Sequence, residues 1–305
     1  MNRPSAATFD LALLERLPGD VVLSPYGLTR ALEVVRAGAT GKTREALDKV
    51  VAPVPDVDGI ISAQAAWLGE GYTAGPKLTL DTGPLDADKV NAWSNEKTHG
   101  MVPRIVERFN GDEILAITDA EYLDAKWVNP FEHTRPAPFE GAGEVPMMSV
   151  EARFDHADDA IRLPYRDTDL AFVAMLGDWH DVEWRHGQGT VELPRFSTTA
   201  ELELTEALID LGLGPAFEFG RDLEELVTGP GDKGLSRVLQ RARVDVDEAG
   251  TKAAATTAVM ARAVSMPLNP FHLIFDRPFT WAVEHAPTGT LLFVGRVLNP
   301  TERSD

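Results

Sequence analysis

The sequence predicts an α+β fold with a large mixed or antiparallel central sheet, on three observations. Apolar residues alternate with period two in several segments, most clearly in residues 238–246, and this spacing is typical of strands. Other segments, such as residues 28–35, repeat their apolar residues at helical spacing. Helices and strands do not alternate strictly, as they do in a doubly wound fold. The pattern favours a central sheet with additional sheets and surrounding helices.

Helices are expected mainly in the first part of the chain. Ser24 and Pro25 mark one helix start, because serine accepts hydrogen bonds from the first free amides and proline presets φ at the first helical position. Gly38 ends that helix. The other segments with helical spacing are residues 9–17, 43–50, 86–106 with a break at Gly100, and 200–211.

Strands are expected where apolar residues alternate or run continuously. Residues 114–128 form a long apolar run and are the candidate for the centre of a sheet. A hairpin should lie near the end of the chain, since residues 280–284 and 290–297 flank a turn with Pro287 and Gly289. The other expected strands are residues 60–68, 162–176, 191–196 and 238–246.

Composition and charge narrow the classes of function. The 305 residues carry 29 Lys and Arg against 48 Asp and Glu, a net charge of −19, so no nucleic-acid partner is expected. The chain has no cysteine, which excludes disulfides and thiol catalysis. No window approaches the ~18 apolar residues of a membrane-spanning helix, so no membrane partner is expected. No linker or internal repeat divides the chain, and a single domain over residues 1–305 is expected.

The N-terminal segment lacks the apolar core of a signal peptide, because Asp10, Glu15 and Arg16 interrupt it. A soluble, cytoplasmic protein is therefore expected, unless a leader precedes the printed sequence. The abundance of Ala, Asp, Glu and Arg over Lys is in keeping with a GC-rich bacterial source.

Sequence motifs of catalysis are missing. The chain contains no G-x-S-x-G, no H-E-x-x-H and no phosphate-binding glycine loop, so neither catalytic residues nor enzymatic activity are expected. His180 and His186 lie near acidic residues, and residues 155–159 are also rich in acids, but neither spacing is typical of a metal site. Both segments are interpreted as solvated loops, and no metal or cofactor is expected.

Residues 248–257, with the sequence EAGTKAAATT, differ from an ordinary surface loop. Turns are usually built from Gly, Pro, Asn and Asp. This segment consists mainly of Ala and Thr and directly follows a predicted strand. Such small residues tolerate an extended backbone and can pass between two strands. The segment is interpreted as a loop able to add itself to a sheet, which would release stored conformational energy.

Several motifs, in this order along nearly the whole chain, resemble the serpins, a family of protease inhibitors and their non-inhibitory relatives. They are SPYGLTRAL (24–32), GATGKTREAL (38–47), VNAWSNEKTHGMVPRIV (90–106), ILAITDAEYLDAKWVNPF (114–131), VPMM (145–148), VELPRF (191–196), VDEAGTKAAATTA (246–258), DRPFTWAV (276–283) and TGTLLFVGRVLNP (288–300). Compared with the usual serpin layout, residues 51–88 and 177–190 are short. The resemblance therefore implies a compact, bacterial-type serpin with shortened peripheral helices.

The resemblance implies that residues 248–270, approximately, form an exposed reactive-centre loop that serves as bait for a protease. After cleavage, the part before the cut would insert into the central sheet and trap the acyl-protease, a suicide-substrate mechanism. Insertion requires small side chains on the inward face. With Gly250 as the hinge glycine after Glu248, the residues on that face are Thr251, Ala253, Ala255 and Thr257, and all four are small.

The spacing typical of the family places the reactive bond between Val264 and Ser265. A bond after valine implies a serine protease with a small apolar specificity pocket, elastase-like or subtilisin-like. The alternative bond, between Arg262 and Ala263, would imply a trypsin-like target. The inhibitor itself is expected to be a monomer.

The resemblance also implies a polar gate that holds the central sheet closed until cleavage. Ser24 is retained, whereas Gly27, Asp119 and Gln240 replace the serine, asparagine and histidine common in the family. Gln240 shares the parity of the apolar residues in its strand, and an unpaired buried amide costs roughly 1–3 kcal/mol. Asp119 is the candidate acceptor for that amide, and Ser24 could serve either residue.

Trp127 retains the bulky residue that serpins have near the point where insertion begins. The changed gate leaves two functions open. If the gate works with different chemistry, the chain is an inhibitor. If the gate is loosened, the chain is a non-inhibitory serpin that serves as a binding, storage or chaperone-like protein.

Overall fold

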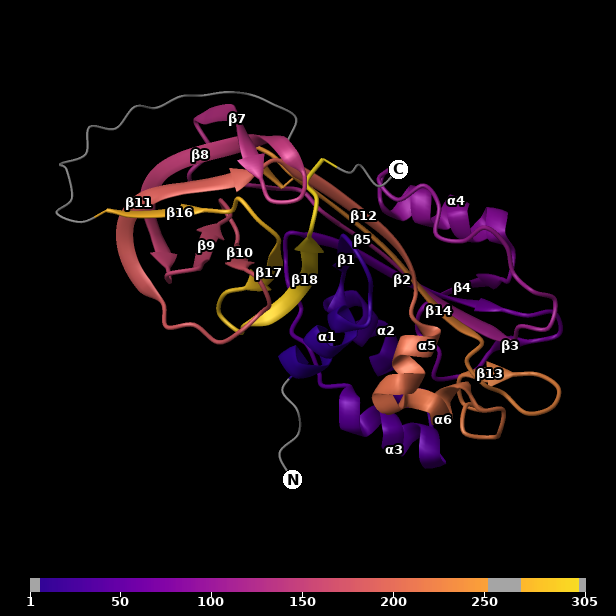
Figure 1. Ribbon diagram of the computed structural model, residues 1–305. Helices are drawn as coiled ribbons and strands as arrows, with labels where there is room; N and C mark the ends of the chain where they lie inside the picture. Colours follow the sequence, from indigo (N-terminus) through magenta and orange to yellow (C-terminus); the bar gives the residue numbers. More distant parts are fainter. Residues whose placement is uncertain (1–5, 252–269, 302–305) are drawn as a thin grey trace.

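A seven-stranded central sheet organises one half of the molecule (Figure 1). The computed structural model describes residues 6–251 and 270–301. The strand order of the central sheet is β4 (Asp81–Pro84), β2 (Ile60–Leu68), β5 (Leu115–Leu123), β14 (Arg237–Val246), β15 (Gly250–Thr251) and β6 (Ala125–Lys126), and β12 (Phe196–Glu203) pairs with β14. Parallel and antiparallel neighbours both occur in it, which confirms the predicted mixed sheet.

A curved nine-stranded sheet forms the other half. Its order is β1 (Val21–Leu23), β18 (Thr290–Val297), β17 (Phe279–His285), β10 (Leu170–Leu176), β9 (Ala160–Pro164), β8 (Gly143–His156), β11 (Arg185–Pro194) and β16 (Phe271–Ile274), with β7 (His133–Phe139) paired to β8. A third, two-stranded sheet joins β3 (Thr73–Ala74) to β13 (Val227–Thr228). The antiparallel β17–β18 pair confirms the hairpin expected near the end of the chain.

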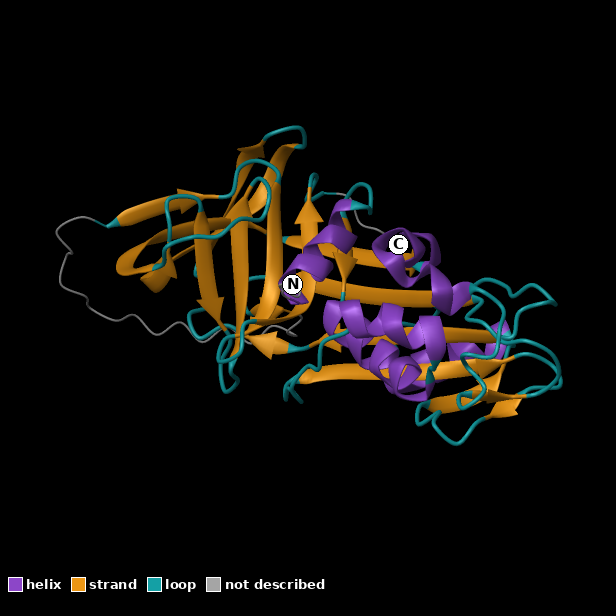
Figure 2. Ribbon diagram, turned by 90° about the horizontal axis from the view of Figure 1, so that it is seen from below, coloured by secondary structure: helices purple, strands orange, loops and turns teal. Residues whose placement is uncertain are grey.

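Helices lie on both faces of the central sheet, and the first two helices also pack against β18 of the nine-stranded sheet (Figure 2). They are α1 (Ala6–Glu15), α2 (Pro25–Gly38), α3 (Gly41–Val50), α4 (Ala87–Lys97), α5 (Thr205–Leu208) and α6 (Gly214–Phe217), with a π-helical turn over Ile209–Leu213. Val90 of α4 packs in a small apolar cluster on one face, and α2 packs against β2 and β5 on the other. Ser24 caps α2 by accepting from the Gly27 amide, as expected.

The pairing of β5 with β14 defines the state of the central sheet. These two strands run parallel and pair directly from Ala116 opposite Arg237 to Tyr122 opposite Arg243. Every residue of β5 is buried, in agreement with its predicted place at the centre of a sheet. The sheet is therefore closed along this ladder, with no strand between β5 and β14.

Two expected helices are shorter in the structure than the sequence indicated. The segment expected to be helical over residues 86–106 is helical only in α4, because His99 and Gly100 both take positive φ and the chain then folds back. Asn91 fixes the returning segment by accepting hydrogen bonds from the amides of Ile105 and Val106. Residues 200–203, expected to begin a helix, continue β12, because their backbone pairs with β14.

Three expected strands also have different bounds. The run over residues 114–128 is broken at Asp124 into β5 and β6. The run over residues 162–176 is the β9–β10 hairpin. The strand expected over residues 191–196 is divided at Arg195 between β11 and β12. Residues 51–86 and 178–184, where the sequence is short, contain no helix in the structure.

Candidate functional site

The hinge of the predicted loop lies in the hydrogen-bonded ladder of the central sheet. Thr251 is opposite Val246 of β14 on one side and Ala125 of β6 on the other, and both pairings are antiparallel. The Thr251 residue is 0% exposed. The two residues of β15 thus lie between β14 and β6, next to the point where the β5–β14 ladder begins.

Gly250 is required by the close approach of two backbones. A Cβ atom at this position would overlap the carbonyl oxygen of Ala125 and lie 2.8 Å from the Cα of Lys126. Its φ is not positive, so the constraint is space and not a left-handed conformation. The local turn is fixed by Asp247, whose Oδ1 accepts from the amides of Ala249, at 2.8 Å, and of Gly250, at 3.1 Å.

Trp127 packs at the hinge and not with the other predicted gate residues. Its indole Nε1 donates to the carbonyl of Asp247 at 2.9 Å, and its amide donates to the carbonyl of Ala249 at 3.0 Å. The indole stacks on Tyr165 with ring centroids 4.6 Å apart. The Tyr165 hydroxyl in turn hydrogen-bonds with the hydroxyl of Thr251. Trp127 therefore packs against the segment that leads into Gly250 and Thr251.

An ionic contact anchors the chain just before the hinge. Glu248 accepts hydrogen bonds from Arg195 and from the hydroxyl of Thr134. Burial acts to raise the pKa of Glu248, but these hydrogen bonds outweigh it and lower the pKa. Sequence analysis identified Glu248 but missed both partners, because they lie far away in the chain and carry no motif.

The structure brings Ser24, Asp119 and Gln240 into one buried cluster. The Gln240 amide nitrogen donates to Asp119 Oδ2 at 2.6 Å and to the Ser24 carbonyl at 2.7 Å. Its amide oxygen accepts from the Ser24 backbone amide at 2.7 Å. Gln64 of β2 donates to Asp119 Oδ1 at 2.8 Å. Asp119 is thus the acceptor for Gln240 that the sequence predicts, and the cluster links α2, β5 and β14.

Glu121 is a fifth member of this cluster, and sequence analysis missed it. Its two carboxylate oxygens contact the hydroxyls of Ser62, at 2.5 Å, and of Ser24. Glu121 lies two residues after Asp119 in a strand, so both side chains point to the same face. A pair of acids with this spacing inside a mostly apolar strand was a signal available in the sequence.

Gly27 provides the space for the two acids. A Cβ atom on Gly27 would lie 2.5 Å from each carboxylate oxygen of Asp119 and closer still to Glu121 Oε1. The residue that differs from the family's serine on α2 thus complements the acid on β5. Burial raises the pKa of Asp119 to about 7, against the hydrogen bonds from Gln64 and Gln240. Burial and the neighbouring Asp119 raise the pKa of Glu121 well above its ordinary value.

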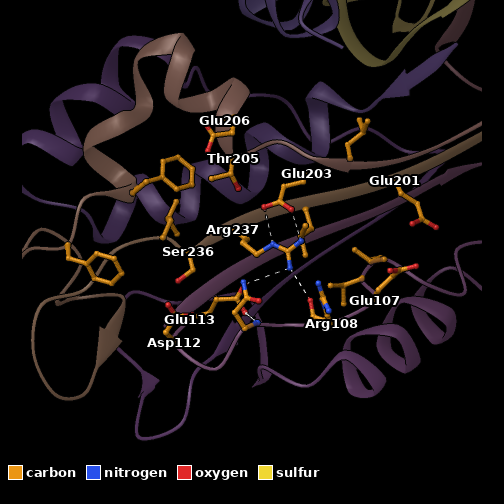
Figure 3. Close-up of a pocket in the computed structure, with 18 residues that line it drawn as sticks. Glu107, Arg108, Asp112, Glu113, Glu201, Glu203, Thr205, Glu206, Ser236 and Arg237 are labelled. Carbon is orange, nitrogen blue, oxygen red and sulfur yellow. Dashed lines mark hydrogen bonds and ion pairs between the residues drawn. The ribbon is translucent and has the colours of Figure 1, made fainter. Parts of the chain in front are cut away.

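A groove of about 690 Å³ lies at the end of β14 farthest from the hinge (Figure 3). At its centre Arg237 is ion-paired with Glu203 Oε2, at 2.6 Å, and with Glu113 Oε1, at 3.7 Å. Acids outnumber bases in its lining, which includes Glu107, Arg108, Asp112, Glu113, Glu201, Glu203, Glu206 and Arg237. Sequence analysis singled out none of these residues, and the groove contains neither hinge nor gate residues.

The remaining predicted loop residues lie outside the described part of the chain. These are Ala253, Ala255, Thr257, Arg262, Ala263, Val264 and Ser265. Within residues 6–251 and 270–301, no three His, Asp or Glu residues are grouped closely enough to hold a metal ion. His180 and His186 form separate contacts, with Asp159 and Asp155 respectively. The described helices include none with the length and apolar character needed to cross a membrane.

Comparison with known proteins identifies relatives over most of the chain. Residues 72–300 match the sequence model of the family described as "Serpin (serine protease inhibitor)". The chain is 27% identical to the leukocyte elastase inhibitor of Bos taurus, with 98% of each chain covered. Among solved structures it is similar to tengpin, a thermophilic serpin in the native state, with TM-score 0.84, 22% identity and 96% and 92% of the two chains covered. It is also similar to human thyroxine-binding globulin, with TM-score 0.82, 19% identity and 97% and 98% covered.

Proposed function

We propose that this chain, which belongs to the serpin family, inhibits a serine protease as a suicide substrate. The protease serine would attack the carbonyl carbon of Val264, and the Val264–Ser265 peptide bond would break. The Ser265 nitrogen leaves as an amine after taking up a proton, and Val264 stays bound to the protease as an ester. Insertion of the freed strand between β5 and β14 would then carry the acyl-protease along and distort it.

The placement of the hinge is the observation that carries this proposal. Gly250 and Thr251 already extend the central sheet between β14 and β6, while β5 and β14 are still paired with each other. A strand inserted from this start would have to separate that ladder and form hydrogen bonds on both of its sides. Two rows of backbone hydrogen bonds would replace the single row of the separated ladder. This net gain of one row, together with the burial of apolar surface, supplies a driving force.

The registers on the two sides of β15 agree with each other. Continued along β5, the antiparallel pairing of Thr251 with Ala125 places Ala253, Ala255 and Thr257 opposite Leu123, Glu121 and Asp119. Continued along β14, the pairing of Thr251 with Val246 places them opposite Val244, Ala242 and Gln240. These two sets match the closed ladder, in which Asp119 is opposite Gln240. One inserted strand can therefore pair with both neighbours without a bulge.

This register gives each inward residue a suitable neighbour. Ala253 and Ala255 would enter the face that carries the buried Leu123, Glu121, Val244 and Ala242, and their small side chains suit a buried position. Thr257 would lie between Asp119 and Gln240. Its hydroxyl can donate to Asp119 and accept from the Gln240 amide, which replaces the direct hydrogen bond between these two residues. The polar gate would thus be satisfied both before and after insertion, which supports a working gate built from changed residues.

The proposed target is an elastase-like or subtilisin-like protease. Valine before the reactive bond suits a small apolar specificity pocket, and a relative of the chain is named as an inhibitor of leukocyte elastase. If Arg262 precedes the bond instead, the target is trypsin-like. The inhibitor is proposed to act as a monomer.

The test is incubation with elastase, subtilisin and trypsin, followed by denaturing gels and mass spectrometry. The expected result is a gel-stable complex with elastase or subtilisin, together with a released peptide that begins at Ser265. A peptide that begins at Ala263, with trypsin in the complex, would move the reactive bond to Arg262.

A pair of variants separates insertion from binding. Thr251→Arg places a long charged side chain on the buried face, so it should be cleaved at the wild-type rate without forming complex. Lys252→Arg is the control, because residue 252 would face the opposite side of the proposed inserted strand, and it should form complex as wild type does. Equal complex formation by both variants would contradict the insertion mechanism.

The second candidate function is a non-inhibitory serpin that serves as a binding, storage or chaperone-like protein. It is favoured by the replacements at Gly27, Asp119 and Gln240. It predicts that every protease cleaves the loop without forming complex. It also predicts that the melting temperature of the cleaved protein does not rise, whereas insertion of the loop raises it strongly.

A further inference from the structure

The proton count around Ser24 differs from that of an ordinary capping serine. Its hydroxyl oxygen is 2.7 Å from the carbonyl oxygen of Leu292 in β18, and it also contacts Glu121 Oε2. A serine hydroxyl has one proton to donate. A carbonyl oxygen only accepts, so the contact with Leu292 takes the serine proton. The contact between Ser24 and Glu121 then requires a proton that belongs to Glu121.

The other oxygen of Glu121 fits the same assignment. Ser62 donates its hydroxyl proton to Glu121 Oε1, and the Ser62 oxygen accepts from the amide nitrogen of Gln64 at 2.7 Å. One oxygen of Glu121 is thus an acceptor and the other a donor, which is the pattern of a neutral carboxylic acid. Asp119 has the opposite pattern, since each of its oxygens accepts from an amide, from Gln64 or from Gln240.

The charged groups around this pair do not neutralise it. Of the elements packed against the two acids, β2 and β14 present the uncharged Ser62, Gln64 and Gln240, and β18 presents a carbonyl. The start of α2 lies beneath them and favours one negative charge. Arg30 of α2 also attracts negative charge, but its guanidinium is hydrogen-bonded to Asp56 and to the Tyr26 hydroxyl, each at 2.8 Å.

We propose that Glu121 is protonated while the central sheet is closed, and that loss of this proton makes the separation of β5 from β14 easier. Asp119 and Glu121 would form a proton-dependent latch in which a single negative charge is tolerated and a second is not. The latch rests on the proposed opening of the sheet, but not on inhibition of a protease. It differs from a histidine gate because deprotonation, and not protonation, adds the unfavourable charge.

The direction of the pH effect follows from linkage. Two carboxylates that approach the same point above Gly27 repel each other when both are ionised in a buried site. Opening of the sheet would admit water, which lowers the pKa of Glu121 toward its ordinary value, so that the proton is released. The closed state binds more protons than the open state, so its stability falls as pH rises. The stabilisation is complete below the ordinary pKa of 4.5 and is lost through the raised pKa values of the pair.

Hydrogen exchange of the intact protein tests the latch without any protease. The exchange rates of the β5 and β14 amides are measured in wild type and in Glu121→Gln, first near pH 6 and then near pH 8.5. At each pH the two proteins are compared with each other, so that the intrinsic pH dependence of exchange cancels. The Gln side chain offers an acceptor oxygen and an N–H donor group but holds no ionisable proton. Opening of the wild-type ladder should increase by up to about tenfold per pH unit relative to the variant.

Glu96→Gln is the matched control, because it makes the same substitution at an exposed position of α4. It should follow the wild type. If the ratio of the wild-type exchange rate to the Glu121→Gln exchange rate is the same at both pH values, the proposed latch is wrong. Should Glu121→Gln fail to fold, infrared spectroscopy of Asp10→Asn replaces it, because burial also raises the pKa of Asp10 to about 7 and its band would otherwise be mistaken for that of Glu121. A carboxylic-acid carbonyl band that persists at pH 6 and weakens toward pH 8.5 is expected, and its absence at pH 6 overturns the proposal.

Discussion

Glu248 is ion-paired with Arg195, the single residue that separates β11 from β12. This contact joins the chain just before the hinge to the point where the nine-stranded sheet passes into the central sheet. Phe131 adds to the anchor, since its amide donates to the Glu248 carbonyl at 2.9 Å. The chain therefore enters β15 from a defined position.

Removal of this ion pair should release the hinge without unfolding the protein. For Arg195→Met we expect a loss of about 0–1 kcal/mol, because both side chains are partly exposed and the pair is screened by solvent. Hydrogen exchange at the amides of Gly250 and Thr251 should become faster. Arg185→Met, which removes an exposed ion pair with Asp158, is the control and should leave these amides unchanged.

The same anchor has a pH dependence of the opposite sign to the latch. The pKa of Glu248 is lowered from 4.5 in the folded protein, so its contribution to stability is present above that value and is lost as pH falls through the lowered pKa. The protection of Gly250 and Thr251 should decrease in that acidic range. An unchanged pH profile in Glu248→Gln would show that the ion pair does not hold the hinge.

Gly250→Ala should expel the hinge from the sheet. The added methyl group would overlap the Ala125 carbonyl, which belongs to a paired strand and cannot move freely. Overpacking of this kind costs typically about 1–3 kcal/mol. The variant should show a lower free energy of unfolding in urea and lose protection at Thr251. Gly111→Ala is the control, since nothing lies near its added Cβ and its φ is not positive; comparable losses in both variants would refute the steric argument.

Gly27→Ser should destabilise this chain, although serine is the residue common in the family. The new side chain would overlap carboxylate oxygens of Asp119 and Glu121, and we expect a loss of about 1–3 kcal/mol in urea denaturation. In Gly27→Ser combined with Glu121→Ala, space is restored and part of the loss should be recovered. The two changes must therefore be non-additive. Additive losses would mean that Gly27 does not serve to accommodate Glu121.

Local patterns were sufficient for much of the fold. Ser24 and Pro25 predicted the start of α2, the apolar pattern predicted β2 and β14, and the turn with Pro287 and Gly289 predicted the β17–β18 hairpin. Each of these signals lies within one segment. Residues 200–203 were wrongly expected to be helical. Their apolar spacing suits either conformation, and the choice was made by hydrogen bonds to β14.

The gate was predictable only in part. Gln240, Asp119 and Ser24 were identified from the resemblance, and the parity of Gln240 indicated that it needs a partner. Glu121 could have been found from its spacing to Asp119. Arg195, Thr134 and Ser62 could not, because each acts on a residue distant in sequence and follows no local pattern.

By itself, the sequence determined the small side chains of the hinge, the caps and most of the strands, since these depend on the preferences of residues and their immediate neighbours. Only the tertiary structure decided that the hinge already lies between β14 and β6, and that two acids meet above a glycine. The physical reason is that register and the position of a proton are set by contacts between elements. The proton on Glu121 is inferred because the single hydroxyl of Ser24 contacts both the Leu292 carbonyl oxygen and Glu121 Oε2. These residues are far apart in the sequence, so no local pattern could predict the contact.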